Sequence, residues 1–199
     1  MNCLENIFEK RRSIYNLGNK ISLQDSEVEN LLKQALKNVP SAFNSQSSSI
    51  VLLLGKSHLK LWNDITLNAL KKIIPEEKFE QTKNRISSFA KAYGTVLFFE
   101  NTDIIKALEK QFPEYAANFI VWANQTSAML QYMIWTLLAE NNIGASLQHY
   151  NPLIDQDIKS TFNIPSSWKL IAQMPFGNIL KPAENKSFLD INKRFAVYK

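Results

Sequence analysis

The stretch Ile50-Val51-Leu52-Leu53-Leu54-Gly55 contributes most to the fold prediction. A short apolar run that ends at a glycine is typical of a buried strand in the centre of a sheet. A second run, Gly94-Thr95-Val96-Leu97-Phe98-Phe99, has the same character. Both runs are flanked by longer segments in which apolar residues recur at helical spacing. The sequence therefore predicts buried strands that are connected by helices.

The helix from Val28 to Val39 is the most clearly bounded one. It follows Ser22-Leu23-Gln24-Asp25, which fits a capping-box pattern, and Pro40 ends it. Further helices are expected at 4–12, 57–74, 75–91 and 113–140, with a short one after Asp103. Further strands are expected at 145–150 and 169–174. Residues 188–198 are expected to be extended or partly helical. Strands separated by long helices, with little sign of hairpins, predict a three-layer α+β domain that spans residues 1–199.

Bulk composition is that of a folded globular protein. The chain has 199 residues, of which 45% are hydrophobic, which is enough for one sizeable core and argues against disorder. Its single cysteine, Cys3, excludes an internal disulfide and favours a reducing compartment. The start has no signal-peptide pattern, and Gln131 interrupts the longest apolar run, 126–139. We expect a cytoplasmic protein without a membrane span.

Several functional classes are disfavoured by residue spacing. The net charge is +5, but lysines and arginines are scattered among acidic residues, so nucleic-acid binding is not expected. The two histidines, His58 and His149, lie on unrelated segments, so no metal site is expected. The five glycines are too far apart for a G-x-G-x-x-G or phosphate-loop motif, and no G-x-S-x-G occurs. The spacing therefore argues against a dinucleotide fold of the usual kind and against a nucleophilic triad.

Three polar segments remain as candidates for a site. Arg11-Arg12-Ser13 offers two guanidinium forks that suit a phosphate, although an arginine pair at a helix end also complements the helix dipole. Pro40-Ser41-Ala42-Phe43-Asn44-Ser45-Gln46 is either a connecting loop or a binding loop that presents an aromatic ring among amides. The third is Gly144-Ala145-Ser146-Leu147-Gln148-His149-Tyr150. Each is flanked by apolar sequence, which is how polar sites are commonly built on a buried scaffold.

In order and position these segments resemble the FMN-dependent nitroreductase family. The similarity is greatest to its short subgroup, which includes the yeast fatty-acid-repression-mutant protein and bacterial relatives. It implies an interlocked homodimer with a central mixed or antiparallel sheet flanked by helices, and non-covalent FMN at the subunit interface. NADH or NADPH would be the co-substrate, and nitroaromatic or quinone-type acceptors would be reduced in a two-step, ping-pong hydride mechanism.

The resemblance also implies roles for individual residues. Arg11, Arg12 and Ser13 would contact FMN, Ser41, Phe43 and Asn44 would approach its ring from the partner subunit, and the backbone of Leu147, Gln148 and His149 would face the N5 and O4 edge. Lys186 would reach the phosphate, and Arg194 is either a second cation or part of a solvated tail. His149 is either a proton donor or a histidine that bonds the backbone at a strand end.

Aromatic and sulfur-containing residues on the predicted helix 113–140 invite two interpretations. The set Trp122, Met129, Met133, Trp135 and Leu137 is at helical spacing and fits a core or a dimer seam better than a substrate box. Phe43, with Trp122 or Tyr132, is of the type that stacks on aromatic acceptors. A second functional hypothesis is an FMN-binding regulatory or stress-response protein with little turnover; rapid reduction by NAD(P)H and repeated turnover with a quinone would favour the enzyme.

Overall fold

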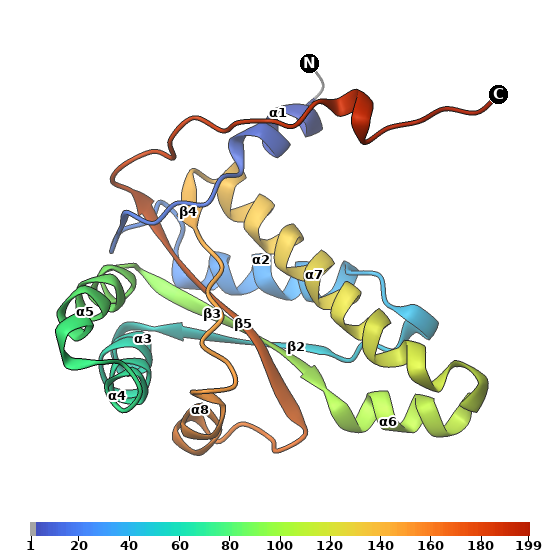
Figure 1. Ribbon diagram of the computed structural model, residues 1–199, viewed down its shortest axis with the longest axis horizontal. Coiled ribbons are helices and arrows are strands. Elements are labelled where there is room, and N and C mark those ends of the chain that lie inside the picture. The colour runs from blue at the N-terminus through green and yellow to red at the C-terminus, as the bar shows by residue number, and fades with distance from the viewer. Residues whose placement is uncertain (1–2) are drawn as a thin grey trace.

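The computed structural model describes residues 3–199, with side chains from Asn6 onward, so the side chain of Cys3 lies outside the described part. The sheet has the order β1–β5–β3–β2, and β4 also pairs with β5 (Figure 1). Every pairing between these strands is antiparallel. The strands are β1 (Leu17–Gly18), β2 (Ser48–Leu54), β3 (Gly94–Asn101), β4 (Ile143–Ala145) and β5 (Trp168–Ile179).

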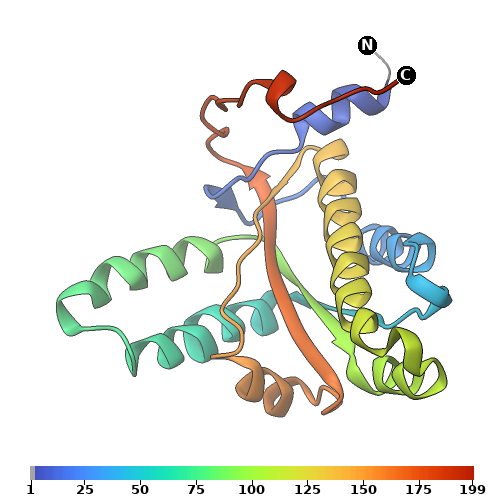
Figure 2. The same ribbon diagram turned by 45° about the vertical axis from the view of Figure 1, so that its right-hand side comes forward.

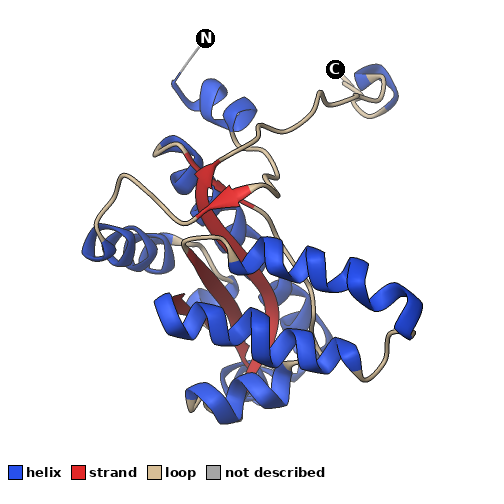
Figure 3. Cartoon of the chain, turned by 90° about the vertical axis from the view of Figure 1, so that its left-hand side faces the viewer, coloured by secondary structure: helices blue, strands red, loops and turns tan. Residues whose placement is uncertain are grey.

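Helices lie on both sides of this sheet, as Figures 2 and 3 show. A π-helical turn, Lys60–Thr66, joins α3 to α4, and short 3₁₀ turns occur at Ala42–Asn44, Pro113–Tyr115 and Ile191–Lys193. The helices are α1 (Cys3–Lys10), α2 (Asp25–Asn38), α3 (Gly55–Leu59), α4 (Leu67–Lys71), α5 (Glu76–Ala90), α6 (Thr102–Gln111), α7 (Ala116–Glu140) and α8 (Asp155–Phe162). Among these described helices, none combines the length and apolarity required to cross a bilayer.

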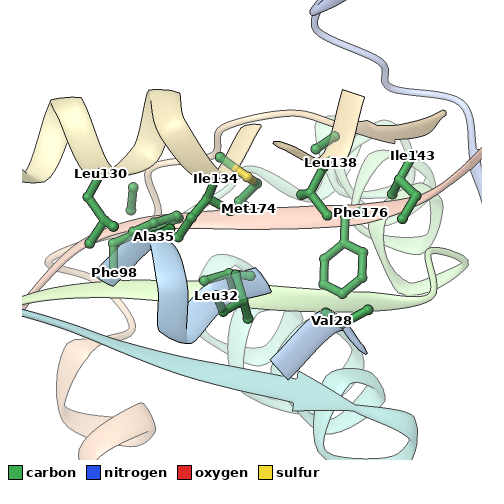
Figure 4. Packing of buried hydrophobic residues seen from close by; sticks show 13 residues of the cluster. Val28, Leu32, Ala35, Phe98, Leu130, Ile134, Leu138, Ile143, Met174 and Phe176 are labelled. Carbon is green, nitrogen blue, oxygen red and sulfur yellow. The ribbon is translucent and has the colours of Figure 1, made fainter. Parts of the chain in front are cut away.

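One face of the sheet is covered by α2 and α7. Figure 4 shows Leu130, Ile134 and Leu138 of α7 reaching down to the strands, with α2 beside them. These three side chains lie four residues apart, so they share one face of the helix. From β3, Val96 and Phe98 point into this cluster. Each fully buried leucine, isoleucine or phenylalanine side chain contributes roughly 1.5–3 kcal/mol through removal of apolar surface from water.

The opposite face is covered by α3 to α5 and by α8. Here Leu97 and Phe99 of β3 pack against Trp62 and Phe89, which are both fully buried. Alternate residues of β3 therefore enter opposite clusters, as the two-residue repeat of a strand requires. The three-layer α+β architecture predicted from the sequence is confirmed.

The prediction that Ile50–Leu54 forms a central strand is wrong. It forms part of β2, which pairs only with β3 and lies at the end of the strand order in the described chain. Val51 and Leu52 remain partly exposed along it. An apolar run indicates that both faces are covered, but it carries no information about whether both edges are hydrogen-bonded.

Local boundaries also differ from expectation. Helix α2 begins at Asp25, and its first turn is capped by the Glu27 carboxylate, which accepts the Gln24 N–H at 2.7 Å, so the box expected from Ser22 is placed two residues too early. Of the strand predicted at 145–150, only Ala145 belongs to β4, and Gln148 forms a single bridge to Gln173. Strand β1 and helix α8 were not predicted, and the helix predicted at 57–74 ends at Lys71.

Candidate functional site

A pocket of about 740 Å³ lies between the chain segment after α1 and the segment after β5. Its two walls are residues 11–16 and residues 181–187. The first wall is fixed to the rim of the sheet, because Ser13 bridges Ala145 and the Ile14 N–H donates to the Ala145 carbonyl at 2.9 Å. In Figure 1 the chain beyond β5 returns to the end of α1. Both chain ends therefore contribute to one site.

Positive charge dominates the lining of this pocket. The lining contains one carboxylate side chain, that of Glu184, and four cationic ones, those of Arg11, Arg12, Lys181 and Lys186. The Arg12 guanidinium donates through Nη2 to the Glu184 backbone carbonyl at 2.6 Å, which leaves its charge unneutralised. The pocket thus suits an anion with several oxygens, such as a phosphate.

Arg11 is held differently from Arg12. Its guanidinium carbon lies 4.4 Å from the centre of the Trp135 ring and 5.8 Å from that of Tyr132. The Arg11 Nε atom is buried and has no hydrogen-bond partner among the described residues. A buried donor without a partner costs about 1–3 kcal/mol, so an incoming acceptor at this position is favoured. Three of the predicted phosphate contacts, Arg11, Arg12 and Lys186, therefore line one pocket together with Ser13.

The segment around Gln148 runs beside β5, and residues that hydrogen-bond to β5 through their backbone N–H alternate with residues that do not. Gln148 exchanges both backbone hydrogen bonds with Gln173, at 2.7 and 2.9 Å, and its side chain is buried against the Ser146 hydroxyl. The Gln148 N–H is therefore already paired. In the described chain, the N–H groups of Leu147 and His149 make no backbone hydrogen bond, as expected for residues that alternate with a bridged one. The His149 side chain is exposed.

The loop at residues 40–46 has an unusual backbone. Phe43, Asn44 and Gln46 have φ values of 56°, 50° and 50°, in the left-handed region that non-glycine residues seldom adopt. The Ser41 hydroxyl accepts the Gln46 N–H at 3.0 Å and so stabilises the turn. Strained positions of this kind concentrate at functional sites.

The ring of Phe43 is 49% exposed and contacts aromatic rings of the connection between α6 and α7 and of α7 itself. Its partner with the most parallel ring is Trp122, at 6.0 Å between ring centres and 23° between ring planes. Trp122 and Trp135 are separated by thirteen positions on the same helix, or about 20 Å along its axis. Within one chain, Phe43 and Asn44 therefore lie far from Arg11. Arg194 is exposed and does not line the pocket.

A buried carboxylate accepts hydrogen bonds from the two residues that follow this loop. Glu100 is 1% exposed, and both of its oxygens accept hydroxyl hydrogen bonds, from Ser47 (2.6 Å) and from Ser48. Burial raises the pKa of Glu100, and the two hydroxyl donors partly oppose that rise. Glu100 was not predicted as a site residue, since a single glutamate at the end of an apolar strand carries no signal of burial.

Among the residues described, no group of three or more His, Cys, Asp or Glu side chains is arranged to hold a metal ion. Two buried titratable groups near the candidate segments are Glu100 and Tyr150. Burial raises the pKa of Tyr150, whose ring packs edge-on against Trp62 at 5.8 Å. Cation–oxygen contacts and backbone donors are the chemistry that this site offers.

Comparison with known proteins places the chain in a family. The model of the nitroreductase family matches residues 8–178. In Saccharomyces cerevisiae, HBN1 is 33% identical over 90% of this chain and 89% of its own length, and the nitroreductase FRM2 is 30% identical over 93% and 92%. The chain belongs to the nitroreductase family and is by class an oxidoreductase. The family resemblance inferred from the three polar segments is confirmed.

Solved structures agree with this assignment. The nitroreductase CinD from Lactococcus lactis, in complex with nicotinic acid, is 41% identical, covers 98% of this chain and 100% of its own, and superposes with a TM-score of 0.91. CinD structures with chloramphenicol and with 4-nitrophenol match similarly. A nitroreductase with bound FMN from Desulfitobacterium hafniense shares the fold, at 14% identity, full coverage of both chains and a TM-score of 0.73.

Proposed function

We propose that this protein is an FMN-dependent oxidoreductase that transfers electrons from NADH or NADPH to nitroaromatic or quinone-type acceptors. The observation that carries the proposal is the cationic pocket, in which Arg11 presents a buried donor without a partner. A terminal phosphate monoester has the charge and the oxygen acceptors that such a pocket requires. The FMN-bound fold relative supports the choice of flavin.

Within this proposal, Arg11, Arg12 and Lys186 hold the phosphate, and Ser13 makes a smaller polar contact. The Leu147 and His149 N–H groups are the donors available to the polar edge of the ring, because the Gln148 N–H is paired with Gln173. Bound FMN would supply the redox chemistry, which is two-step transfer of a hydride and electrons from the nicotinamide to the acceptor. Backbone donors at that edge stabilise negative charge without the need to reorganise.

A second copy of the chain supplies Ser41, Phe43 and Asn44 in this proposal. The distance along α7 from Trp122 to Trp135 supports it, since one chain presents its loop and its phosphate pocket about 20 Å apart. The outer edge of β2 also supports it, because a long apolar strand edge is normally covered. So does the tail: Phe188, Phe195 and Tyr198 are 81%, 69% and 95% exposed. Such apolar exposure marks an interaction surface.

The acceptor is proposed to be a small planar aromatic compound. The CinD complexes with 4-nitrophenol and chloramphenicol support this choice by homology. Phe43 offers a half-exposed ring for stacking, and the exposed His149 is the side chain proposed to donate a proton to the reduced acceptor. Arg194 is proposed as an additional cation in the assembled dimer.

The test begins with the purified protein. It is expected to be yellow, dimeric and loaded with roughly one FMN per chain. NADH or NADPH is expected to reduce the flavin under anaerobic conditions. With a quinone present, the protein is expected to turn over repeatedly. Arg11→Ala is expected to weaken FMN binding about 30-fold, because a charged hydrogen-bond donor is lost. A colourless monomer that binds no added FMN would overturn the proposal. Tight FMN binding with negligible turnover would instead indicate the regulatory, stress-response alternative.

A further inference from the structure

The Trp135 side chain contacts the guanidinium of Arg11. The indole is partly buried on α7, and the Arg11 guanidinium lies over its face at 4.4 Å. Tyr132, one turn earlier, adds a second and more distant ring at 5.8 Å. The Arg11 side chain is thereby held at the wall of the cationic pocket by contacts with aromatic faces. None of the ion pairs among the described residues involves Arg11.

This type of contact keeps the donors of the guanidinium free. A carboxylate partner would occupy two N–H groups of an arginine and cancel its charge, whereas an aromatic ring attracts the cation through its face. The five N–H groups of arginine lie in the guanidinium plane, so a contact with an aromatic ring does not use them as a carboxylate would. Among the described residues, the Nε of Arg11 indeed has no hydrogen-bond partner. An arginine that is ordered but not neutralised is what a phosphate site requires.

We propose that Trp135 is a positioning residue of the phosphate pocket, whose indole face orders the Arg11 side chain before the ligand arrives. The inference rests on the proposed function, because it takes the ligand of Arg11 to be the FMN phosphate. A long arginine side chain that is free in solution loses rotamer freedom when it binds, and the indole removes part of that cost in advance. Trp135 acts through Arg11 and not through the flavin ring.

The test compares two ligands that differ only in the phosphate. Apoprotein of the full chain is titrated with FMN and with riboflavin, and the ratio of the two dissociation constants measures the contribution of the phosphate. In Trp135→Leu, FMN binding is expected to weaken about fivefold while riboflavin binding is unchanged, as the loss of one partly buried cation–π contact implies. Trp135→Phe keeps an aromatic face and is expected to restore most of the ratio.

A double-mutant cycle shows whether Trp135 acts through Arg11. In the Arg11→Ala background, Trp135→Leu is expected to have no further effect on the FMN to riboflavin ratio. Trp168→Leu is the matched control. Trp168 is also partly buried and packs on an aromatic ring, that of Phe99, at 5.7 Å between ring centres. It lies at the first residue of β5, whereas the pocket wall follows the last. The control is expected to leave the ratio unchanged. Urea midpoints show whether each variant is folded.

Three results would overturn the inference. One is an equal loss of FMN and riboflavin affinity in Trp135→Leu, which would indicate a role in ring binding or in folding. Another is a Trp135→Phe variant as weak as Trp135→Leu, since the aromatic face would then be irrelevant. The third is a normal ratio in Trp135→Leu alongside a reduced ratio in Arg11→Ala; the phosphate assignment would stand and only the role of Trp135 would fall. If the wild-type protein binds neither flavin, both proposals fail.

Discussion

Two clusters of buried polar groups differ in whether their hydrogen bonds are satisfied within the described chain. On the α3–α5 side of the sheet, His58, Trp62 and Thr95 form a closed network. The Trp62 indole N–H donates to the Thr95 hydroxyl at 2.9 Å, and the two ring nitrogens of His58 contact the Thr95 hydroxyl (2.9 Å) and the Ala90 carbonyl (3.2 Å). At the wall of the cationic pocket, by contrast, Arg11 Nε and the Nε1 of its neighbour Trp135 are buried and have no partner in the described chain.

The difference separates groups that stabilise the fold from groups that remain available to a ligand. The contacts of His58 fit a neutral ring, with Nε2–H donating to Ala90 and Nδ1 accepting from Thr95. Burial lowers the pKa of His58, which agrees with a neutral ring. In this network the hydrogen-bonding groups of His58, Trp62 and Thr95 are paired with one another or with Ala90 and are not available to a ligand. The pocket retains both charge and donors, and this is the property expected of a binding site.

The largest expected effect comes from breaking the closed network. Thr95→Val keeps the size of the side chain and removes the hydroxyl, which leaves the Trp62 N–H and His58 Nδ1 without their shared partner. Two buried groups without partners are expected to lower the free energy of unfolding by about 2–4 kcal/mol. Urea denaturation measures this loss. The FMN affinity of the folded fraction is expected to be unchanged; a large change in it would show that the two regions are coupled.

An intermediate effect is expected at Glu100, a closed site that contains an ionisable group. Its pKa in the folded state is raised above the ordinary value of 4.5. The folded state therefore binds the proton more tightly than the unfolded chain, and stability falls as the pH rises from 4.5 towards the raised pKa. Glu100→Gln is expected to remove this slope, so that its stability relative to wild type increases as the pH rises.

Denaturation midpoints measured from pH 4.5 to 8 test this prediction. The exposed Glu114 provides the matched control, because Glu114→Gln should leave the pH dependence unaltered. A parallel pH profile in Glu100→Gln and wild type would show that the buried carboxylate does not titrate in this range. Glu100 would then keep one protonation state, and its hydrogen bonds with Ser47 and Ser48, throughout this pH range.

The smallest effect is expected at the rim of the open pocket. Lys186 is exposed, so Lys186→Ala is expected to weaken FMN binding only about threefold, and less at high salt. Lys181 lines the same pocket but lies 4.0 Å from the Glu184 carboxylate, so Lys181→Ala should have a still smaller effect. Titrations at low and high ionic strength compare the two variants. Equal losses would mean that the pocket responds to its total charge and not to individual positions.

Much of the fold was predictable from local patterns, because a strand buried on both faces and an amphipathic helix each leave a periodic signature. The runs at Ile50–Leu54 and Gly94–Phe99 became β2 and β3, and the apolar repeat before Pro40 became α2. What failed depended on long-range pairing. Strand β1 has two residues and exists only because Leu17 and Gly18 bond to β5, and α8 is too short for a clear repeat.

The sequence by itself determined the family, the three-layer architecture and the chemical types present in the candidate site, since residue identity decides charge and hydrogen-bonding capacity. Only the tertiary structure decided which of those groups meet. It joined Arg11, Arg12 and Lys186 across almost the whole chain length, kept Phe43 and Asn44 apart from them, and paired the Gln148 N–H with β5. It also showed that an indole holds Arg11, because such a contact depends on the crossing of α1 and α7 and leaves no mark in the sequence.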